Sequence, residues 1–289
     1  MKTVLTIALV ALFPLVTLAQ ENTPKNPSKN EGKIVFTTKS KVKLSGSIAD
    51  MLSKEQLEKL QNRVTHKELL FNNKESVYKK HEAKKEDDTP SEQQFSGAGT
   101  NVVIKFAGGA ANDDQLYYNI EENQVVDMRT FMGRRFLIKD EASKATWKIK
   151  GDSKKILGYD CKKAVMEKEK VTVEAWFTMQ IPVASGPAGY GQLPGMILEL
   201  KRIPKPTKDK EEKKDDGNGG VRISSTSSAV TTTTATKINF ESLAKGAIVP
   251  PKKGKKVTRK QFKKIVDKKM KEMKEMYRNK GGGIRIERN

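Results

Sequence analysis

The chain of 289 residues is 36% hydrophobic and 31% charged, and it carries a formal net charge of +21 and a single cysteine. This length allows one large domain or two small ones, and the low apolar content leaves much of the chain to linkers, loops or solvated helices. One cysteine excludes an intrachain disulfide, so the fold depends on its hydrophobic core. The positive charge favours a polyanionic partner: nucleic acid, anionic lipid or acidic glycan.

Residues 1–19 have the pattern of a secretory signal peptide. Lys2 precedes an apolar run that is interrupted by Pro14, and Ala19 ends a small-residue cleavage site. The run is shorter than the ~20 apolar residues needed to span a bilayer. We therefore expect an exported protein of the periplasm or cell envelope, soluble or peripheral to a membrane, with no transmembrane span after signal cleavage.

The mature chain begins with residues 20–32, whose polar, proline-containing composition predicts a flexible linker. A β domain is expected over residues 33–250. Its first strand is predicted over Lys33–Leu44, and a short helix follows over Met51–Val64 with Ser53 as the expected N-cap.

Short strand-like runs then recur, separated by Gly, Asn or Asp turn residues. This spacing predicts an antiparallel sheet or an open barrel. The charged segment His81–Gly99 is predicted to be loop. The predicted strands are Leu69–Lys80, Asn101–Phe106, Gln115–Asn119, Gln124–Arg129, Arg134–Ile138, Thr146–Lys150, Val171–Thr178 and Met196–Leu200.

The part of the β domain after residue 200 is compositionally biased. Residues 201–220 form a charged low-complexity insertion that is expected to be disordered. The Ser/Thr-rich run that ends at Phe240 is expected to rejoin the sheet, because threonine favours strands.

The C-terminal segment 256–280 predicts a basic amphipathic helix, in which Thr258 and Gln261 form a capping-box pattern. Residues 245–289 contain 17 Lys or Arg and 4 Asp or Glu, so more than half of the net charge lies there. Two arrangements are open: the helix lies on an anionic membrane surface, or it docks its apolar stripe onto the sheet. The lysines expected to contact an anionic surface are Lys260, Lys263, Lys264, Lys268 and Lys271.

The motifs of common enzymes and metal sites are absent from the sequence. Cys161 would need a histidine partner for catalysis, and only His66 and His81 exist, so a buried structural cysteine is the better interpretation. Two histidines and one cysteine without ligand spacing do not predict a zinc site. No catalytic residue, metal ligand or cofactor is therefore predicted. A copper(I) site remains a minor alternative, because three methionines share one helical stripe, namely Met270, Met273 and Met276.

Nucleic acid is the least favoured of the polyanionic partners. An exported protein would not meet it, and no recognition module is visible in the sequence. Only Phe262 and Tyr277 offer stacking surfaces in the basic tail.

A series of short motifs between residues 129 and 200 carries a family resemblance. In this order they resemble the GLPGLI family, which consists of exported proteins, mostly from the Bacteroidota, with no established biochemical function. The motifs are Trp147-Lys148-Ile149, Ile156 to Ala164 (ILGYDCKKA), Ala175 to Thr178 (AWFT), Ile181-Pro182, Gly186-Pro187 and Leu193 to Leu200 (LPGMILEL). The signature residues are Trp147, Gly158, Tyr159, Cys161, Trp176, Pro182, Gly186, Pro187, Leu193, Pro194 and Gly195.

The namesake motif departs from the family at two positions, where Gln192 and Met196 replace Gly and Leu. Pro194-Gly195 suits a type II turn that anchors an apolar strand in the core. A ligand-binding rim is the alternative reading of this region, built from Pro182, Gly186, Pro187 and Tyr190.

The resemblance implies a curved antiparallel sheet, bowl-like or half-barrel, to which the sequence adds the short N-terminal helix and the basic C-terminal helix. The expected function is a non-enzymatic binding module for an envelope or outer-membrane protein, an apolar ligand or an anionic lipid. An envelope hydrolase without a recognisable motif is the alternative.

Overall fold

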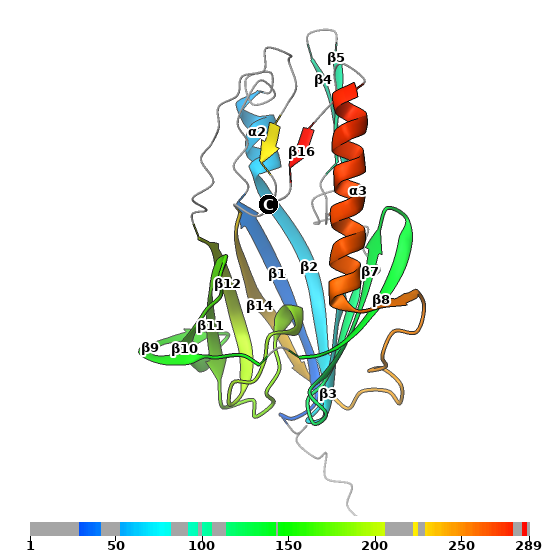
Figure 1. Cartoon of the computed structure of the whole chain (residues 1–289). Coiled ribbons are helices and arrows are strands. Elements are labelled where there is room, and N and C mark those ends of the chain that lie inside the picture. The colour runs from blue at the N-terminus through cyan, green and yellow to red at the C-terminus, as the bar shows by residue number, and fades with distance from the viewer. Residues whose placement is uncertain are drawn as a thin grey trace, which may run out of the picture.

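The computed structural model describes residues 29–41, 53–81, 92–97, 100–105, 114–142, 144–205, 222–224, 229–279 and 285–287. The dominant element is one open sheet of 12 strands, in the order β15-β8-β7-β6-β3-β2-β1-β14-β12-β11-β10-β9 (Figure 1). The prediction of a mainly β protein is therefore confirmed. The strands are β1 (Gly32–Lys41), β2 (Asn62–Phe71), β3 (Glu75–Lys80), β6 (Gln115–Asn119), β7 (Gln124–Phe131), β8 (Arg134–Glu141), β9 (Lys148–Ile156), β10 (Tyr159–Glu167), β11 (Val171–Thr178), β12 (Met196–Pro204), β14 (Val230–Phe240) and β15 (Lys255–Val257).

The remaining elements are short or lie outside this sheet. In the described ranges, two α-helices are present, α2 (Lys54–Gln61) and α3 (Arg259–Asn279), together with the 3-10 turn η2 (Pro187–Gly189). Neither α-helix is long and apolar enough to cross a membrane. Two further pairs of strands form separate small sheets, namely β4 (Glu92–Gly97) with β5 (Thr100–Lys105) and β13 (Arg222–Ser224) with β16 (Arg285–Glu287).

The Ser/Thr-rich run is central to the sheet. β14 pairs with β1 on one side and with β12 on the other, so the prediction that this run rejoins the sheet is confirmed. The hydroxyls of Thr38 and Thr233 lie 2.9 Å apart across the β1–β14 ladder. Cross-strand threonine pairs of this kind stabilise antiparallel neighbours.

The N-terminal helix is shorter than predicted. Ser53 caps it as expected, because its hydroxyl accepts a bond from the amide of Gln56 and the Gln56 side chain accepts one from the amide of Ser53. The helix ends at Gln61, and the chain enters β2 at Asn62, so the predicted helical position of Val64 is wrong. Pairing of β2 along the whole of β1 outweighs the helical spacing of these few residues.

Several other predicted boundaries change where strands pair. The predicted strand Leu69–Lys80 is two strands, β2 and β3, joined by a turn in which the Asn72 side chain accepts bonds from the amides of Lys74 and Glu75. The predicted loop His81–Gly99 contains β4, which pairs with β5. The first residues of the insertion expected at 201–220 are instead strand, because β12 continues to Pro204 and pairs with β11.

Some expectations lie outside the described residues. These are the signal peptide 1–19, most of the linker 20–32, and the insertion beyond residue 205. The last linker residue, Gly32, already belongs to β1.

The sheet is bent strongly, which brings β3 close to β12. These strands are four positions apart, so a flat sheet would separate them by about 19 Å. Ser185 bridges them: its hydroxyl lies 2.8 Å from that of Ser76 in β3, and its carbonyl accepts a bond of 3.0 Å from the amide of Ile197 in β12. Ser185 and Ser76 are both buried. The connection between β11 and β12 therefore links the two halves of the sheet through Ser185.

The core consists of three clusters of apolar side chains along this bent sheet. One includes Ile34, Phe36 and Leu198 and spans its centre. A second includes Phe177 and Leu193 near the β9 end. A third lies near the β8 end, where Ile248 of the chain leading to β15 covers it; its buried members are Leu70, Val77, Tyr117, Val126, Met128, Leu137 and Ile248.

Candidate functional site

Helix α3 docks on the β8 end of the sheet. The ring of Phe262 stands edge-on to Phe136 at 5.2 Å and to Phe131 at 6.4 Å between centroids. Val266, one turn further, is only 4% exposed. Arg259 forms an ion pair of 3.4 Å with Asp140 at the end of β8. Of the two arrangements expected for the helix, the first turns therefore adopt the docked one.

The start of α3 is fixed by local bonds. The hydroxyl of Thr258 accepts a bond from the amide of Gln261, and the Gln261 side chain accepts one from the amide of Thr258. The predicted capping box is confirmed. The helix begins at Arg259 and not at 256, because Lys255–Val257 pairs in parallel with Phe136–Ile138 of β8. Because β15 pairs with β8, the helix that follows β15 lies alongside β8.

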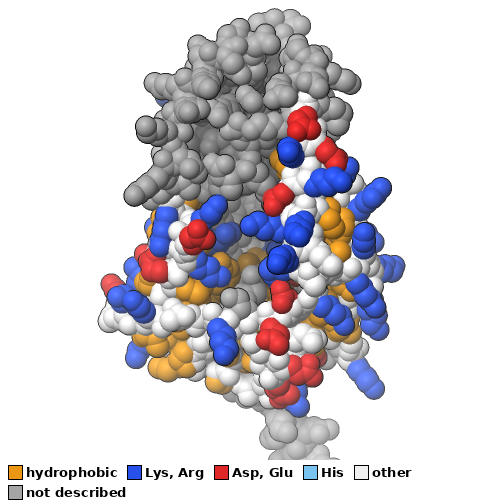
Figure 2. Space-filling view, in the orientation of Figure 1, with side chains coloured by type: hydrophobic (Ala, Val, Ile, Leu, Met, Phe, Trp, Pro, Cys, Tyr) orange, Lys and Arg blue, Asp and Glu red, His pale blue; other side chains and the backbone are white. Residues whose placement is uncertain are grey.

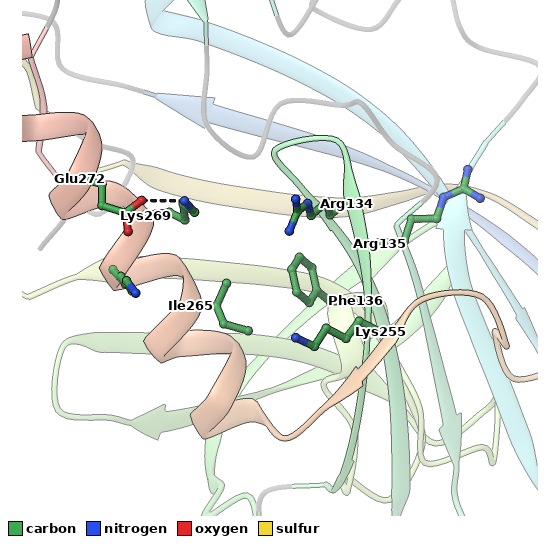
Figure 3. A pocket seen from close by; sticks show the side chains of 8 residues that line it. Arg134, Arg135, Phe136, Lys255, Ile265, Lys269 and Glu272 are labelled. Atoms are coloured by element: carbon green, nitrogen blue, oxygen red, sulfur yellow. Dashed lines mark hydrogen bonds and ion pairs between the residues drawn. The ribbon is translucent and has the colours of Figure 1, made fainter. Parts of the chain in front are cut away.

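A pocket of about 270 Å³ opens between α3, β8 and β15, and we call it the α3–β8 pocket (Figure 3). Its lining combines an apolar floor with a basic wall. The lining residues are Arg134, Arg135, Phe136, Lys255, Ile265, Lys268, Lys269 and Glu272. They come from three elements, of which β8 precedes β15 and α3 by more than 100 residues in sequence.

The electrostatics of the pocket are positive. Glu272 is the only acidic residue among the described lining residues, and it accepts a bond of 2.6 Å from Lys269. This bond lowers the pKa of Glu272, so the carboxylate stays ionised. Figure 3 shows Phe136 and Ile265 facing one another, with Arg134 beside Phe136, whereas the Arg135 side chain turns away from the helix. An anion that carries a small apolar group fits this lining best.

The five lysines predicted to contact an anionic surface divide between two sides of α3. Lys260, Lys263, Lys264 and Lys271 lie within about 100° of one another on the helix, opposite Phe262, and all are exposed. We call these four residues the lysine face. Lys268 instead lines the α3–β8 pocket, one turn from Lys264. Figure 2 shows Lys and Arg side chains crowded along this helix.

The copper alternative rested on three methionines of the same helix. Met270 is half-buried. The side chains of Met273 and Met276 lie outside the described residues. In the part of the chain that the structure describes, no group of three His, Cys, Asp or Glu residues has the arrangement of a metal site.

Most of the signature residues gather around the connection between β11 and β12. Gly186, Pro187, Leu193 and Gly195 are buried in it. Gly186 allows close packing, since a Cβ there would lie 2.7 Å from the Cβ of Ile197. Pro182 and Pro194 are exposed. The ligand-binding rim expected as an alternative would therefore have two of its four members, Gly186 and Pro187, inside the protein.

The turn at Pro194-Gly195 is not the predicted type II turn. The amide of Gly195 donates to the carbonyl of Leu193 at 2.7 Å, which is the three-residue bond of a γ-turn centred on Pro194. Gly195 has a φ of +142°, and a Cβ at this position would lie 2.1 Å from the carbonyl oxygen of Thr178. Only glycine fits here.

Gln192 stands where the resembled family has glycine, and its backbone has a φ of +63°. This left-handed conformation costs a non-glycine residue about 1–2 kcal/mol. The Gln192 side chain offsets part of this cost, because it accepts a bond from the amide of Ala145 and donates to the side chain of Asn123. The departure thus keeps the glycine-like backbone and adds two bonds.

Two signature aromatics pack at the β9 end of the sheet. The indole N–H of Trp147 donates to the carbonyl of Gly191 at 2.9 Å, and its ring lies 6.4 Å from that of Tyr190. Trp176 has the ammonium of Lys154 at 4.4 Å and that of Lys163 at 5.9 Å from its ring centroid.

The remaining signature residues belong to the β9–β10 hairpin. Leu157 and Gly158 both have positive φ, as the two central residues of a type I′ hairpin turn require. Tyr159 is half-buried at the start of β10. Cys161 is buried, as expected, and burial raises its pKa to about 11. A thiol in this state is a packing residue and a poor nucleophile.

The hydrolase alternative requires carboxylates that can act as acid and base. The most buried carboxylate among the described residues is that of Asp127, which accepts a bond of 2.8 Å from Arg129. Burial raises the pKa of the neighbouring Asp114, whose carboxylate accepts a bond from the amide of Thr130. These bonds hold both carboxylates in place beside β6 and β7.

Sequence reasoning missed the strand side of the pocket. Arg134 and Lys255 were not singled out, because each is one of many basic residues in the chain. A usable signal was present at Phe136, an apolar residue that follows two arginines at the start of a predicted strand. The partner helix could not be identified without the β15–β8 pairing.

Comparisons with known proteins give one family match. Residues 110–208 match the family described as "N-glycanase peptide, N-terminal domain". This range runs from just before β6 to just beyond β12 and contains all the signature residues named above. Among curated proteins, nothing matches.

Two solved structures are also similar to the chain. They are described as PNGF-II in C2 and P21 space groups, with 17% and 16% sequence identity and a TM-score of 0.46 each. The similarity covers 82% of this chain but only 33% and 34% of those chains, so the chain spans about a third of their length. At this TM-score the likeness carries no argument about function.

Proposed function

We propose that the chain is an exported, non-enzymatic binding domain of the cell envelope that engages an anionic component of that envelope through α3. The observation that carries this proposal is the docking of α3. Phe262 and Val266 occupy the sheet side of the helix, so the lysine face is left exposed. A cationic face held on a rigid support attracts anionic lipid more effectively than a mobile tail of equal charge.

Three further expectations belong to the same proposal. Export to the periplasm or envelope is supported by the signal-peptide pattern of residues 1–19. Membership of the GLPGLI family is supported by the ordered motifs between residues 129 and 200. A bowl-like form of the sheet is supported by the bridge that Ser185 makes between β3 and β12.

Flotation with lipid vesicles tests the binding proposal. Protein processed by an exporting host is mixed with vesicles of neutral phosphatidylcholine, alone or with anionic phosphatidylglycerol. We expect binding only to the anionic vesicles, and at least about ten-fold weaker binding when Lys260, Lys264 and Lys271 are replaced by Gln.

The matched control removes the same charge elsewhere. Replacement of the exposed Lys148, Lys150 and Lys162 by Gln at the β9 end of the sheet is expected to leave binding nearly unchanged. Equal losses in both triple variants would show that net charge alone drives the association. Failure of the unaltered protein to float with anionic vesicles would refute the proposal.

A carbohydrate-related role is the second candidate. It is favoured by the match of residues 110–208 to a family described as an N-terminal domain of an N-glycanase. The experiment is a glycan array probed with the processed chain. Selective retention by one glycan class at micromolar protein supports this role, whereas uniform signals that disappear in high salt would reduce it to charge attraction.

A further inference from the structure

The α3–β8 pocket brings several cations to one point. Arg134 comes from β8, Lys255 from β15, and Lys268 and Lys269 from α3, whereas Glu272 supplies the single negative charge among the described lining residues. Like charges that converge in a partly enclosed site repel one another, and a bound anion removes this repulsion. Arg134 presents a planar guanidinium, which binds phosphate oxygens in pairs.

The floor of the pocket is apolar. Phe136 is buried and Ile265 is half-buried, and the two side chains face one another between strand and helix (Figure 3). A bare inorganic anion gains nothing from such a floor. A ligand whose charged group continues into a hydrocarbon chain can place its first methylenes there.

The size and position of the pocket restrict the ligand further. A volume of about 270 Å³ lies just below the ~300–1,000 Å³ of common small-molecule sites, which matches a lipid headgroup with its first methylenes. Lys268 of the pocket follows Lys264 of the lysine face by one helical turn. A molecule seated in the pocket therefore lies beside the surface that the proposed function places against anionic lipid.

We infer that the α3–β8 pocket is a specific site for the phosphate headgroup of an anionic lipid, held by Arg134, Lys255 and Lys268 over Phe136 and Ile265. This inference rests on the proposed function. It adds a single saturable site to the diffuse attraction of the lysine face.

Calorimetric titration with a soluble short-chain lipid tests the inference. The probe is dihexanoyl phosphatidylglycerol below its micellar concentration, so no membrane surface is present. The pocket variant carries Arg134→Gln and Lys268→Gln, and the matched variant carries Lys260→Gln and Lys271→Gln on the lysine face. Both remove two positive charges from exposed side chains.

We expect one site per chain in the unaltered protein and at least about ten-fold weaker binding in the pocket variant, because a charge-assisted bond to phosphate is lost. The matched variant should bind the short-chain lipid within about two-fold of the unaltered protein. Equal weakening in both variants, or absence of a saturable site, would overturn the inference. A thermal melt confirms folding, and Lys255→Gln is the second pocket variant should the double variant melt early.

Two competitors decide the source of the phosphate. Glycerol phosphate and inorganic phosphate should each displace the lipid at least about ten-fold less effectively, because neither contacts the apolar floor. Displacement at equal concentration would overturn the lipid assignment in favour of a free phosphate. Vesicle flotation separates the two proposals: flotation without a short-chain site overturns only this inference, and a short-chain site without flotation overturns only the proposed function.

Discussion

At the scale of single residues, the backbone of the connection between β11 and β12 packs so closely against neighbouring strands that two positions accept only glycine. Gly195 and Gly186 lie where a Cβ would overlap with Thr178 and with Ile197, respectively. Backbone groups in this connection form hydrogen bonds with one another. For example, the carbonyl of Ile181 accepts hydrogen bonds from the amides of Val183 and Met196. The signature glycines are thus explained by packing, without a ligand.

Replacement of Gly195 by Ala should reduce the free energy of unfolding by about 3–5 kcal/mol, because the new methyl group overlaps with backbone that cannot move freely. Urea unfolding measures the loss. Gly133→Ala is the control, since Gly133 also has positive φ but open space around its Cα. It should lose only about 1–2 kcal/mol from the backbone conformation. Equal losses in both variants would contradict the steric argument.

The thiol of Cys161 should be unreactive in the folded protein. Its pKa of about 11, raised by burial, leaves roughly one thiol in a thousand ionised at pH 8. Reaction with a disulfide reagent at pH 8 should be at least about a hundred-fold slower than in urea. Because the folded pKa lies above the unfolded one, the stabilisation is complete below about pH 8.5 and decreases as the pH rises towards 11. Rapid labelling without denaturant would contradict this.

At the scale of elements, α3 is a helix whose sides have separate tasks. One side packs Phe262 and Val266 on the sheet, a second lines the pocket through Ile265 and Lys268, and the lysine face is exposed. Helical propensity alone does not fix the position of α3 on the sheet, because the stability of helices in proteins comes mostly from tertiary packing. Docking is provided by the aromatic contacts and the Arg259–Asp140 ion pair.

Replacement of Phe262 by Ala should loosen α3 without unfolding the sheet. The loss of its contacts with Phe131 and Phe136 should cost roughly 2–3 kcal/mol of docking free energy, since the ring is only half-buried. Hydrogen exchange should accelerate over residues 259–270 and remain unchanged in β1 and β14. Lys263→Ala, on the exposed side of the same turn, is the control. Uniform acceleration across the sheet would contradict local docking.

At the scale of the whole molecule, the connection between β11 and β12 contacts strands from both halves of the sheet. The Ser76–Ser185 bond joins β3 to that connection, and Gly189 packs against Leu116 of β6. In the other half of the sheet, the amide of Ile197 in β12 donates a hydrogen bond to the carbonyl of Ser185. The halves of the sheet are thus held together by contacts that no strand pairing supplies.

A double-mutant cycle on Ser76 and Ser185 measures this closure. Ser185→Ala alone leaves the buried Ser76 hydroxyl without this bond and should cost about 1–3 kcal/mol, and Ser76→Ala should behave in the same way. The double variant should lose less than the sum of the two, by about 0.5–1.5 kcal/mol, because both partners are then apolar. Strict additivity in urea unfolding would mean that the bond does not couple the two halves.

The sequence alone determined those features that depend on neighbours in the chain. The N-cap at Ser53 and the capping box at Thr258 were predicted because their hydrogen bonds join residues three positions apart. Strands β6 to β8 were predicted nearly to their ends, because turn residues separate these short strand-like runs. The C-terminal helix followed in the same way from the spacing of its apolar residues.

Only the tertiary structure decided how distant segments meet. The pairing of β14 with β1 and the contact of β3 with Ser185 both join segments separated by more than 100 residues. The α3–β8 pocket has the same origin, because β15 must pair with β8 before Lys255 and Lys268 can face Arg134. Local periodicity contains no information on such pairings; they are selected by the burial that the complete sheet achieves.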